Sequence, residues 1–223
     1  MAILNFVKPD KIVLQKATDF EAQFEFRPLE PGYGVTIGNA LRRVLLNSLE
    51  GYAIVGIKIE GADHEFGTVK GISEDVVEII LNLKQVRFKK KVEHEVSHEK
   101  ITLSLKNKTE FTAANIGEAS PSFEVMNPEL LICTMDPSAK LDIEINIARG
   151  RGYVPAEDNK PKDAPFGYIA TDSIFTPIKN VKYLIENTRV EQRTDFEKLV
   201  MDVVTDGTIH PEEAVKQASR ILI

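Results

Sequence analysis

Two histidines four residues apart are the residues of this sequence best suited to binding a metal. His94-Glu95-Val96-Ser97-His98 matches the H-E-x-x-H pattern of zinc proteases, in which the histidines bind zinc and the glutamate is the general base. That chemistry requires a helix, where residues i and i+4 lie about 6 Å apart on one face. The flanking residues alternate and favour a strand, on which the two histidines would lie about 13 Å apart. We therefore expect a solvated hairpin tip without a metal, and the zinc metalloprotease remains an alternative.

A glycine-rich turn is the second candidate, this time for a nucleotide cofactor. Gly32-Tyr33-Gly34-Val35-Thr36-Ile37-Gly38 lies between a strand and a helix, and Glu60 follows at the end of the next strand, as a ribose-binding acid would. The last glycine comes one residue late for G-x-G-x-x-G. The strand before it, Phe20 to Phe26, alternates and is followed by Pro28 and Pro31, whereas a buried parallel strand would be continuously apolar. An NAD-binding oxidoreductase is therefore kept only as a second alternative, and we expect no cofactor.

Other patterns typical of catalysis are missing from the sequence. Cys133 has no context that would make it a nucleophile, no G-x-S-x-G elbow occurs, and the aspartates do not form a D-x-D pair for magnesium. Arg149-Gly150-Arg151-Gly152-Tyr153 could contact RNA, but a single copy of this pattern favours a loop that binds a protein partner. We expect no catalytic residues in this chain.

The helix expected from Thr36 onward is the clearest element of the sequence. Thr36 is a plausible N-cap and Gly51 a plausible stop, and apolar residues recur between them at helical spacing. These residues are Ile37, Leu41, Val44, Leu45 and Leu49. Ala40, Leu46 and Ser48 widen the apolar face, which predicts burial against a partner as well as against the helix's own domain. Arg42 and Arg43 interrupt it with the residue type that protein interfaces favour.

The remaining elements mix strands and helices without a regular βαβ alternation, which predicts an α+β fold. Expected strands are 20–26, 53–60, 86–96 paired with 100–106 as a charged hairpin, 141–147 and 200–204. A capped helix is expected over 73–83, with Val76, Val77, Ile80 and Leu83 buried, and a terminal helix from Pro211. The polar stretch 156–164 is expected to be a loop.

Composition limits the compartment and the partners. A chain of 223 residues with 43% apolar residues can bury a sizeable core, and its single cysteine cannot form an internal disulfide, which favours the cytoplasm. No apolar run approaches the ~20 residues of a membrane span. With 28 basic and 34 acidic residues the net charge is −6, so direct contact with DNA is not expected.

Five blocks of the sequence, in order, resemble bacterial RNA polymerase alpha subunits. The blocks are Leu29-Glu30-Pro31-Gly32-Tyr33-Gly34 with Thr36 to Leu46, Glu74 to Lys84, Arg149 to Ala156, Arg189 to Asp195, and Asp206-Gly207-Thr208-Ile209 with Pro211 to Ala214. This resemblance implies a discontinuous dimerisation domain, residues 1–50 and 177–223, with an inserted α+β domain over 51–176. It also implies a non-catalytic homodimeric scaffold that nucleates assembly of the beta and beta-prime subunits for DNA-templated transcription, in the cytoplasm and at the nucleoid as part of the polymerase.

The resemblance also implies roles for individual residues. Dimerisation is expected of nine residues on the two helices: Ile37, Ala40, Leu41, Val44, Leu45, Ser48, Ala214, Ala218 and Ile221. Contact with the beta subunit is expected of Gly38, Asn39, Arg42 and Arg43, and contact with beta-prime of Lys84 and Arg189.

Three features depart from the family. The chain ends at Ile223, before the linker and the small domain that binds promoter DNA, so those roles are not expected here. The hairpin that carries His94 and His98 is longer than the family leads us to expect. His210 occupies a helix-cap position where aspartate is usual, which predicts a slightly weaker cap.

Overall fold

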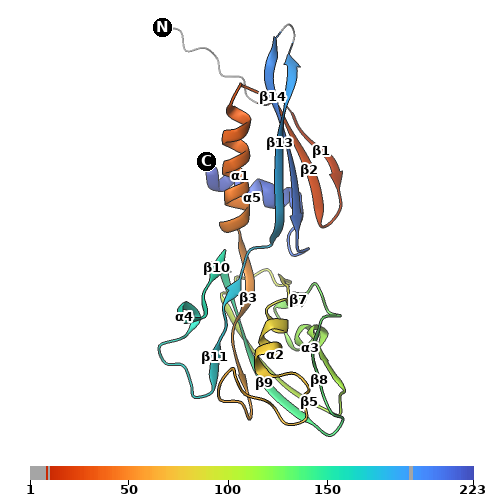
Figure 1. Ribbon diagram of the computed structural model, residues 1–223, viewed down its shortest axis with the longest axis vertical. Coiled ribbons are helices and arrows are strands. Elements are labelled where there is room, and N and C mark those ends of the chain that lie inside the picture. The colour runs from red at the N-terminus through yellow and green to blue at the C-terminus, as the bar shows by residue number, and fades with distance from the viewer. Residues whose placement is uncertain (1–8, 10, 191–192) are drawn as a thin grey trace. The chain divides into compact units, whose positions relative to one another are not determined.

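The computed structural model describes residues 9, 11–190 and 193–223 (Figure 1). The chain divides into two compact units, one formed by Met1–Leu49 with Thr176–Ile223 and the other by Glu50–Phe175. The second unit is therefore inserted, in sequence, between the two halves of the first. Mixed helices and strands in both units confirm the predicted α+β class.

The first unit is built on an antiparallel sheet in the order β1-β2-β14-β13. The strands are β1 Lys11–Ala17, β2 Glu21–Leu29, β13 Ile178–Val190 and β14 Arg193–Thr205. Phe24 and Phe26 of β2 lie opposite Met201 and Leu199 of β14, and all four are buried. This alternation gives the sheet one apolar face.

The strand predicted over Phe20–Phe26 is present, but its bounds differ. β2 begins at Glu21, leaves Phe20 exposed and continues through Pro28. The register between β2 and β14 shifts where Leu29 pairs with Glu197 and Phe26 with Leu199. Pro28 lies at this irregularity, where its missing N–H does not break a regular ladder.

Two helices cover the apolar face of this sheet, α1 over Tyr33–Asn47 and α5 over Pro211–Leu222. Figure 1 shows α1 alongside β13 and α5 close to α1. Leu41 and Leu45 of α1 join Ala214 and Ala218 of α5 in one buried cluster with the sheet. Burial on the sheet, more than helix propensity, therefore holds the two helices.

Both predicted ends of the first helix are wrong. The N-cap is Gly32, with φ +79°, and Thr36 lies inside the first turn. The C-cap is Ser48, and Gly51 belongs to the next strand, where a Cβ would collide with the carbonyl oxygen of Phe175. Gly51 is thus explained by a close backbone approach and not by helix termination.

The second unit has a main antiparallel sheet in the order β11-β3-β9-β5. Its strands are β3 Glu50–Ile59, β5 His98–Lys106, β9 Lys140–Arg151 and β11 Tyr168–Ala170. Shorter pairs are β4 Phe88–Lys90 with β7 Phe123–Val125, β6 Glu110–Thr112 with β8 Leu131–Thr134, and β10 Tyr153–Val154 with β12 Ser173–Ile174. The helices are α2 Val76–Leu83, α3 Ala113–Ala119 and α4 Ala156–Asn159.

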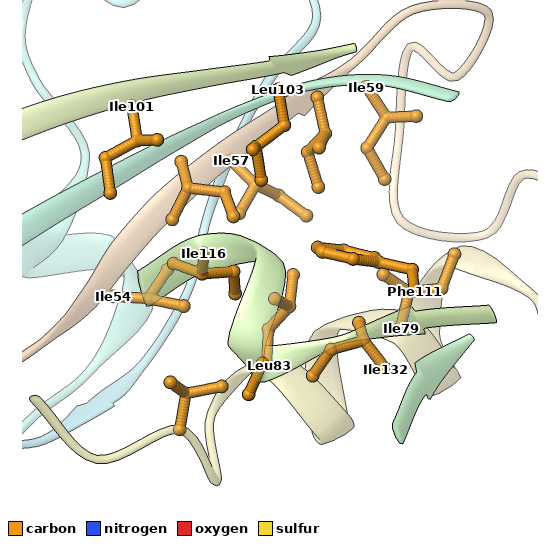
Figure 2. Packing of buried hydrophobic residues seen from close by; sticks show 14 of the residues in the cluster. Ile54, Ile57, Ile59, Ile79, Leu83, Ile101, Leu103, Phe111, Ile116 and Ile132 are labelled. Atoms are coloured by element: carbon orange, nitrogen blue, oxygen red, sulfur yellow. The ribbon is translucent and has the colours of Figure 1, made fainter. Parts of the chain in front are cut away.

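Figure 2 shows the core of this unit, where aliphatic side chains of the sheet meet those of two helices and the short strands. Ile57 and Leu103 come from the sheet, Leu83 and Ile116 from α2 and α3, and Phe111 from β6. All are buried. One continuous apolar cluster therefore stabilises the inserted unit independently of the other.

The predicted helix over 73–83 is present as α2, with a shorter span. Asp75 is its N-cap and completes a capping box, since Glu78 donates its N–H to Asp75 Oδ1 over 2.7 Å and Asp75 donates its N–H to Glu78 Oε2 over 3.2 Å. Ile79 is fully buried, whereas Val77 and Ile80 are only partly covered. The buried face is therefore rotated slightly from the predicted one.

The predicted hairpin of 86–96 with 100–106 is wrong. β4 pairs with β7, and β5 pairs with β9, where Ile101 lies opposite Ile145 and Leu103 opposite Ile143. Pairing with the central strand β9 buries these apolar rows, which a local hairpin of charged residues would leave exposed.

The stretch 156–164 is not entirely loop. Its first residues form α4, and Asn159 Nδ2 donates to the carbonyl oxygen of Thr171 over 2.8 Å and to Ser173 Oγ over 3.0 Å. Hydrogen bonds to a neighbouring segment thus order a stretch with little apolar surface.

In the described residues, no helix combines the length and apolar character needed to cross a membrane.

Candidate functional site on helices α1 and α5

Helix α1 begins against a carboxylate from the far end of the chain. Glu197 on β14 accepts the N–H of Gly32 at 2.7 Å through Oε1 and the N–H of Gly34 at 2.8 Å through Oε2. A helix N-terminus attracts negative charge and offers free N–H groups, which is why it also binds phosphate. In this protein the chain's own carboxylate already occupies the place where a dinucleotide phosphate would bind.

The strand before this turn also contradicts the dinucleotide interpretation. β2 is antiparallel to both of its neighbours, β1 and β14, whereas the nucleotide-binding fold places the turn after a parallel strand. The geometry therefore does not support an NAD-binding oxidoreductase.

One face of α1 is fully occupied by its own sheet. Leu41 and Leu45 are buried, and a Cβ added to Gly38 would lie 2.8 Å from Tyr183 Cδ2 and 3.0 Å from Leu199 Cδ1. Gly38 was expected to contact beta, and the two leucines to form the dimer. All three residues pack inside the unit. They could therefore affect the binding of a partner only indirectly, by fixing the position of α1.

A second face of α1 is apolar and only half-buried. Ile37, Ala40, Val44 and Ser48 follow one another at spacings of three or four residues, and each keeps part of its surface exposed. This strip is the part of the expected dimer face on α1 that a second chain could still cover.

Helix α5 continues the apolar surface. Ala214 and Ala218 are buried against the unit's own core, whereas Ile221 is 52% exposed and Leu222 beside it is 46% exposed. The first turn is capped by His210, whose Nδ1 accepts the N–H of Glu212 at 3.3 Å. The histidine therefore does cap the helix, at a distance longer than that of an ordinary strong hydrogen bond.

An open apolar groove lies between α5 and β1. Its volume is about 430 Å³, and it is lined by Ile12, Leu14, Phe24, Glu212, Val215, Lys216, Ser219 and Arg220. Ile12 and Leu14 belong to the apolar face of the sheet, but they are exposed because they lie beyond the area that α5 covers. The groove adds to the uncovered apolar surface around α5.

The third face of α1 is polar and carries the two arginines. Arg42 Nε donates to the carbonyl oxygen of Val181 over 3.2 Å, so this arginine is bound to β13 of its own sheet. Arg43 is exposed and forms no hydrogen bond or ion pair within the described residues. It lies two residues from both Leu41 and Leu45, which at about 100° per residue directs it away from the sheet. Asn39, one turn earlier, is exposed on the same side.

The two residues expected to contact beta-prime lie in different units. Lys84, the C-cap of α2, is ion-paired with Asp172, with Nζ at 2.7 Å from Oδ1 and 2.6 Å from Oδ2. Arg189 is exposed near the end of β13 and has an interaction within the chain. Neither cation is therefore a lone charge.

The His94–His98 segment has no zinc-site geometry. His98 is the first residue of β5, and His94 lies in the irregular connection from β4, so the segment is neither a helix nor the predicted hairpin tip. Glu95, which would be the base of a protease, pairs with Arg149 at 3.4 Å. Where the structure is described, no three His, Cys, Asp or Glu side chains are grouped to hold a metal. A zinc metalloprotease is not supported.

Cys133 lies in the apolar core of the inserted unit. It is fully buried on β8, and this burial raises the pKa of its thiol to about 12, with the Glu74 carboxylate adding to the rise. The thiolate is the nucleophilic form of cysteine. A thiol held protonated in an apolar core is therefore consistent with a packing role.

Glu197 and Asp172 were not identified from the sequence. The sequence gives a weak indication of a role for Glu197, since this charged residue precedes the apolar residues Leu199, Met201 and Val203 on the same face of β14. The sequence gives no indication of a role for Asp172, because its partner Lys84 is 88 residues away.

Comparison with known proteins identifies what the chain resembles. Residues 57–176 match the family described as the RNA polymerase Rpb3/RpoA insert domain. Over all 223 residues the chain is 60% identical to the DNA-directed RNA polymerase subunit alpha of Cytophaga hutchinsonii and 57% identical to those of Flavobacterium psychrophilum and Bacteroides fragilis. In each case it spans 67% of the relative's length.

Proposed function

Because the chain belongs to the family of DNA-directed RNA polymerase alpha subunits, we propose that two copies form a symmetric, non-catalytic scaffold that binds the beta and beta-prime subunits. The expected resemblance to this family is thereby confirmed.

The observation that carries the proposal is the division of α1 into three faces. One face is buried on the sheet, a second is apolar and half-exposed, and a third presents Asn39 and Arg43. A single helix with an apolar and a charged free face can bind two different partners, the apolar face a second copy and the polar face another protein.

The dimer is proposed to form through the half-buried strip Ile37, Ala40, Val44 and Ser48 together with Ile221 on α5. Two-fold symmetry requires a self-complementary surface. α5 meets this condition in its charges, since Glu212 lies in its first turn and Arg220 in its last. Antiparallel packing of two α5 helices would place these opposite charges together.

The beta subunit is proposed to bind the third face, with Arg43 as its main contact. Arg43 has no partner among the described residues, so its fork of N–H donors is available to a carboxylate of another protein without breaking an existing pair. Arg42 and Gly38 would act indirectly, since each fixes α1 to the sheet.

Beta-prime is proposed to contact Lys84 and Arg189 at two separate places. Lys84 would act together with Asp172, because breaking a bidentate pair to free the lysine alone would cost more than contacting the pair as a whole.

The net charge of −6 fits contact with proteins better than contact with DNA. We also infer that catalysis belongs to partner subunits and that the chain works in the cytoplasm.

The dimer is tested by replacing Ile221 with serine. Its exposed side chain contributes little to folding, but two-fold symmetry would remove it twice from the interface, with a loss of about 1–2 kcal/mol per copy. Light scattering across a dilution series should show dissociation at a concentration at least about tenfold higher than for wild type.

Leu81→Ser is the matched control, because Leu81 is also 52% exposed on a helix but lies on α2 of the other unit. It should leave the dimer unchanged. Equal behaviour of the two variants, or a monomeric wild type at micromolar concentration, would exclude this interface.

A further inference from the structure

The N-terminus of α1 depends on a cap that its own sequence does not supply. Gly32, the N-cap residue, has no side chain to accept an N–H, and the first turn contains no acidic residue. An N-cap side chain ordinarily stabilises a helix by accepting one of the free N–H groups of its first turn. Glu197, 165 residues away from Gly32, provides both acceptors instead.

The two glycines at this turn are explained by the carboxylate. Gly32 has a φ of +79°, which favours glycine, and it turns the chain so that its N–H points at Glu197 Oε1. At Gly34 a Cβ would lie 2.7 Å from Glu197 Oε2 and 3.4 Å from Ile185 Cγ1. A side chain at Gly34 would therefore push the carboxylate away from the helix.

Glu197 provides a polar attachment between α1 and its sheet. A second polar attachment is the hydrogen bond from Arg42 Nε to the carbonyl oxygen of Val181, about two turns further along the helix. Packing at Gly38 brings α1 close to the sheet between these two points. Apolar contacts alone allow a helix to slide or rotate with little directional penalty, whereas hydrogen bonds at separate points fix its position along and around its axis.

We propose that Glu197 is a positioning residue for beta binding: its carboxylate fixes α1 on the sheet so that Asn39 and Arg43 are presented in the orientation that the beta subunit recognises. This inference rests on the proposed function of the third face of α1. Glu197 itself lies on the opposite side of α1 from Arg43, between the helix and the sheet, and does not contact the beta subunit.

Substitution of Glu197 tests the proposal with two independent measurements. Glycine-selective ¹⁵N labelling leaves 13 glycine signals in the protein, among them Gly32 and Gly34, whose amide exchange reports the cap directly. Capture of the purified beta subunit reports binding. In Glu197→Ala both amides should exchange at least about tenfold faster, and beta should bind at least about fivefold more weakly, with the dimer retained.

Glu197→Gln distinguishes a positioning role from a general loss of stability. Its amide oxygen can replace one of the two carboxylate oxygens, whereas its nitrogen cannot accept the other N–H, so both readouts should fall between wild type and Glu197→Ala. Lys198→Ala is the matched control: Lys198 is the next residue on β14, projects to the other face of the sheet and pairs with Glu186 at 2.6 Å. It should change neither measurement.

The outcomes separate this inference from the proposed function. Suppose that the amides of Glu197→Ala exchange faster but that it captures beta normally, whereas Arg43→Ala loses capture. This result would overturn the positioning role of Glu197 and leave the beta face intact. Normal capture by both variants would overturn the beta face itself. If Glu197→Ala fails to fold, Glu197→Gln decides: faster exchange of Gly32 or Gly34 with undiminished capture would also overturn the positioning role.

Discussion

Replacing Arg43 with alanine removes an exposed cation from α1 without disturbing any contact inside the chain. Arg43 forms no hydrogen bond or ion pair within the described residues and projects away from the sheet. Arginine and alanine are both strong helix formers, so the free energy of unfolding should change by less than about 0.5 kcal/mol. The dimer should also persist, because Arg43 lies roughly 100° around the helix from Val44 on the apolar strip.

The effect on binding should be much larger. An interface arginine that donates charge-assisted hydrogen bonds contributes about 2 kcal/mol or more, which corresponds to a dissociation constant about 30-fold higher. Arg43→Lys keeps the charge but loses the planar fork of donors, so its affinity should lie between the two.

The assay compares capture of the purified beta subunit by immobilised wild type, Arg43→Ala and Arg43→Lys, after light scattering has confirmed that each is a dimer. Arg27→Ala is the matched control, since Arg27 is an exposed arginine of the same unit, on β2. Its ion pair with Glu25 is long, at 3.9 Å. Unchanged capture by Arg43→Ala would refute the assignment. A monomeric Arg43→Ala would show that Arg43 belongs to the dimer face instead.

Three further predictions concern the packing of each unit. Gly38→Ala should lower the free energy of unfolding by about 1–3 kcal/mol in urea titrations, because its Cβ would lie 2.8 Å from Tyr183 Cδ2; an unchanged midpoint would contradict the close packing of α1. Asp75→Ala should cost about 1 kcal/mol in the same assay, since it removes the capping box formed with Glu78, and a cost no greater than that of an exposed-surface substitution would refute this. Cys133, with its pKa raised to about 12 by burial, should resist a thiol reagent at pH 8 until the protein is unfolded. Rapid labelling of the native protein would refute the burial of the thiol. Because the folded-state pKa is the higher one, stability should also decline as pH rises above 9.0, the ordinary pKa of the thiol.

Features that depend on neighbouring residues could be predicted from the sequence. The helix of α1 follows from its apolar spacing, and α2 follows from a short periodic segment with a capping residue at its start. In both cases the residues that stabilise the element lie within one or two turns of each other, so their order along the chain carries the information.

Features set by distant residues could not be predicted. Thr36 was the better N-cap by residue type, but the N-cap is Gly32, four residues earlier, because Glu197 supplies the acceptors from β14. The partners of β4 and β5 depend on where apolar rows are best buried, which local charge patterns do not indicate.

For the candidate site, the residue types were informative but their orientation was not. The wide apolar arc of α1 includes residues that its own unit leaves half-exposed, whereas Leu41 and Leu45, which were expected at the dimer interface, face the chain's own sheet. Arg42 and Arg43 are adjacent and chemically identical, and only the fold reveals that one is bound to Val181 and the other has no partner among the described residues.

The proposal that this chain is a dimeric scaffold is tested most directly by sedimentation equilibrium of the purified chain, alone and mixed with the purified beta subunit. Alone, it should show twice the 24.9 kDa mass of one chain at micromolar concentration. With beta, a stable complex that contains two copies of this chain should form. A species of 24.9 kDa that binds beta one to one, or a dimer that does not bind beta, would contradict the proposed scaffold.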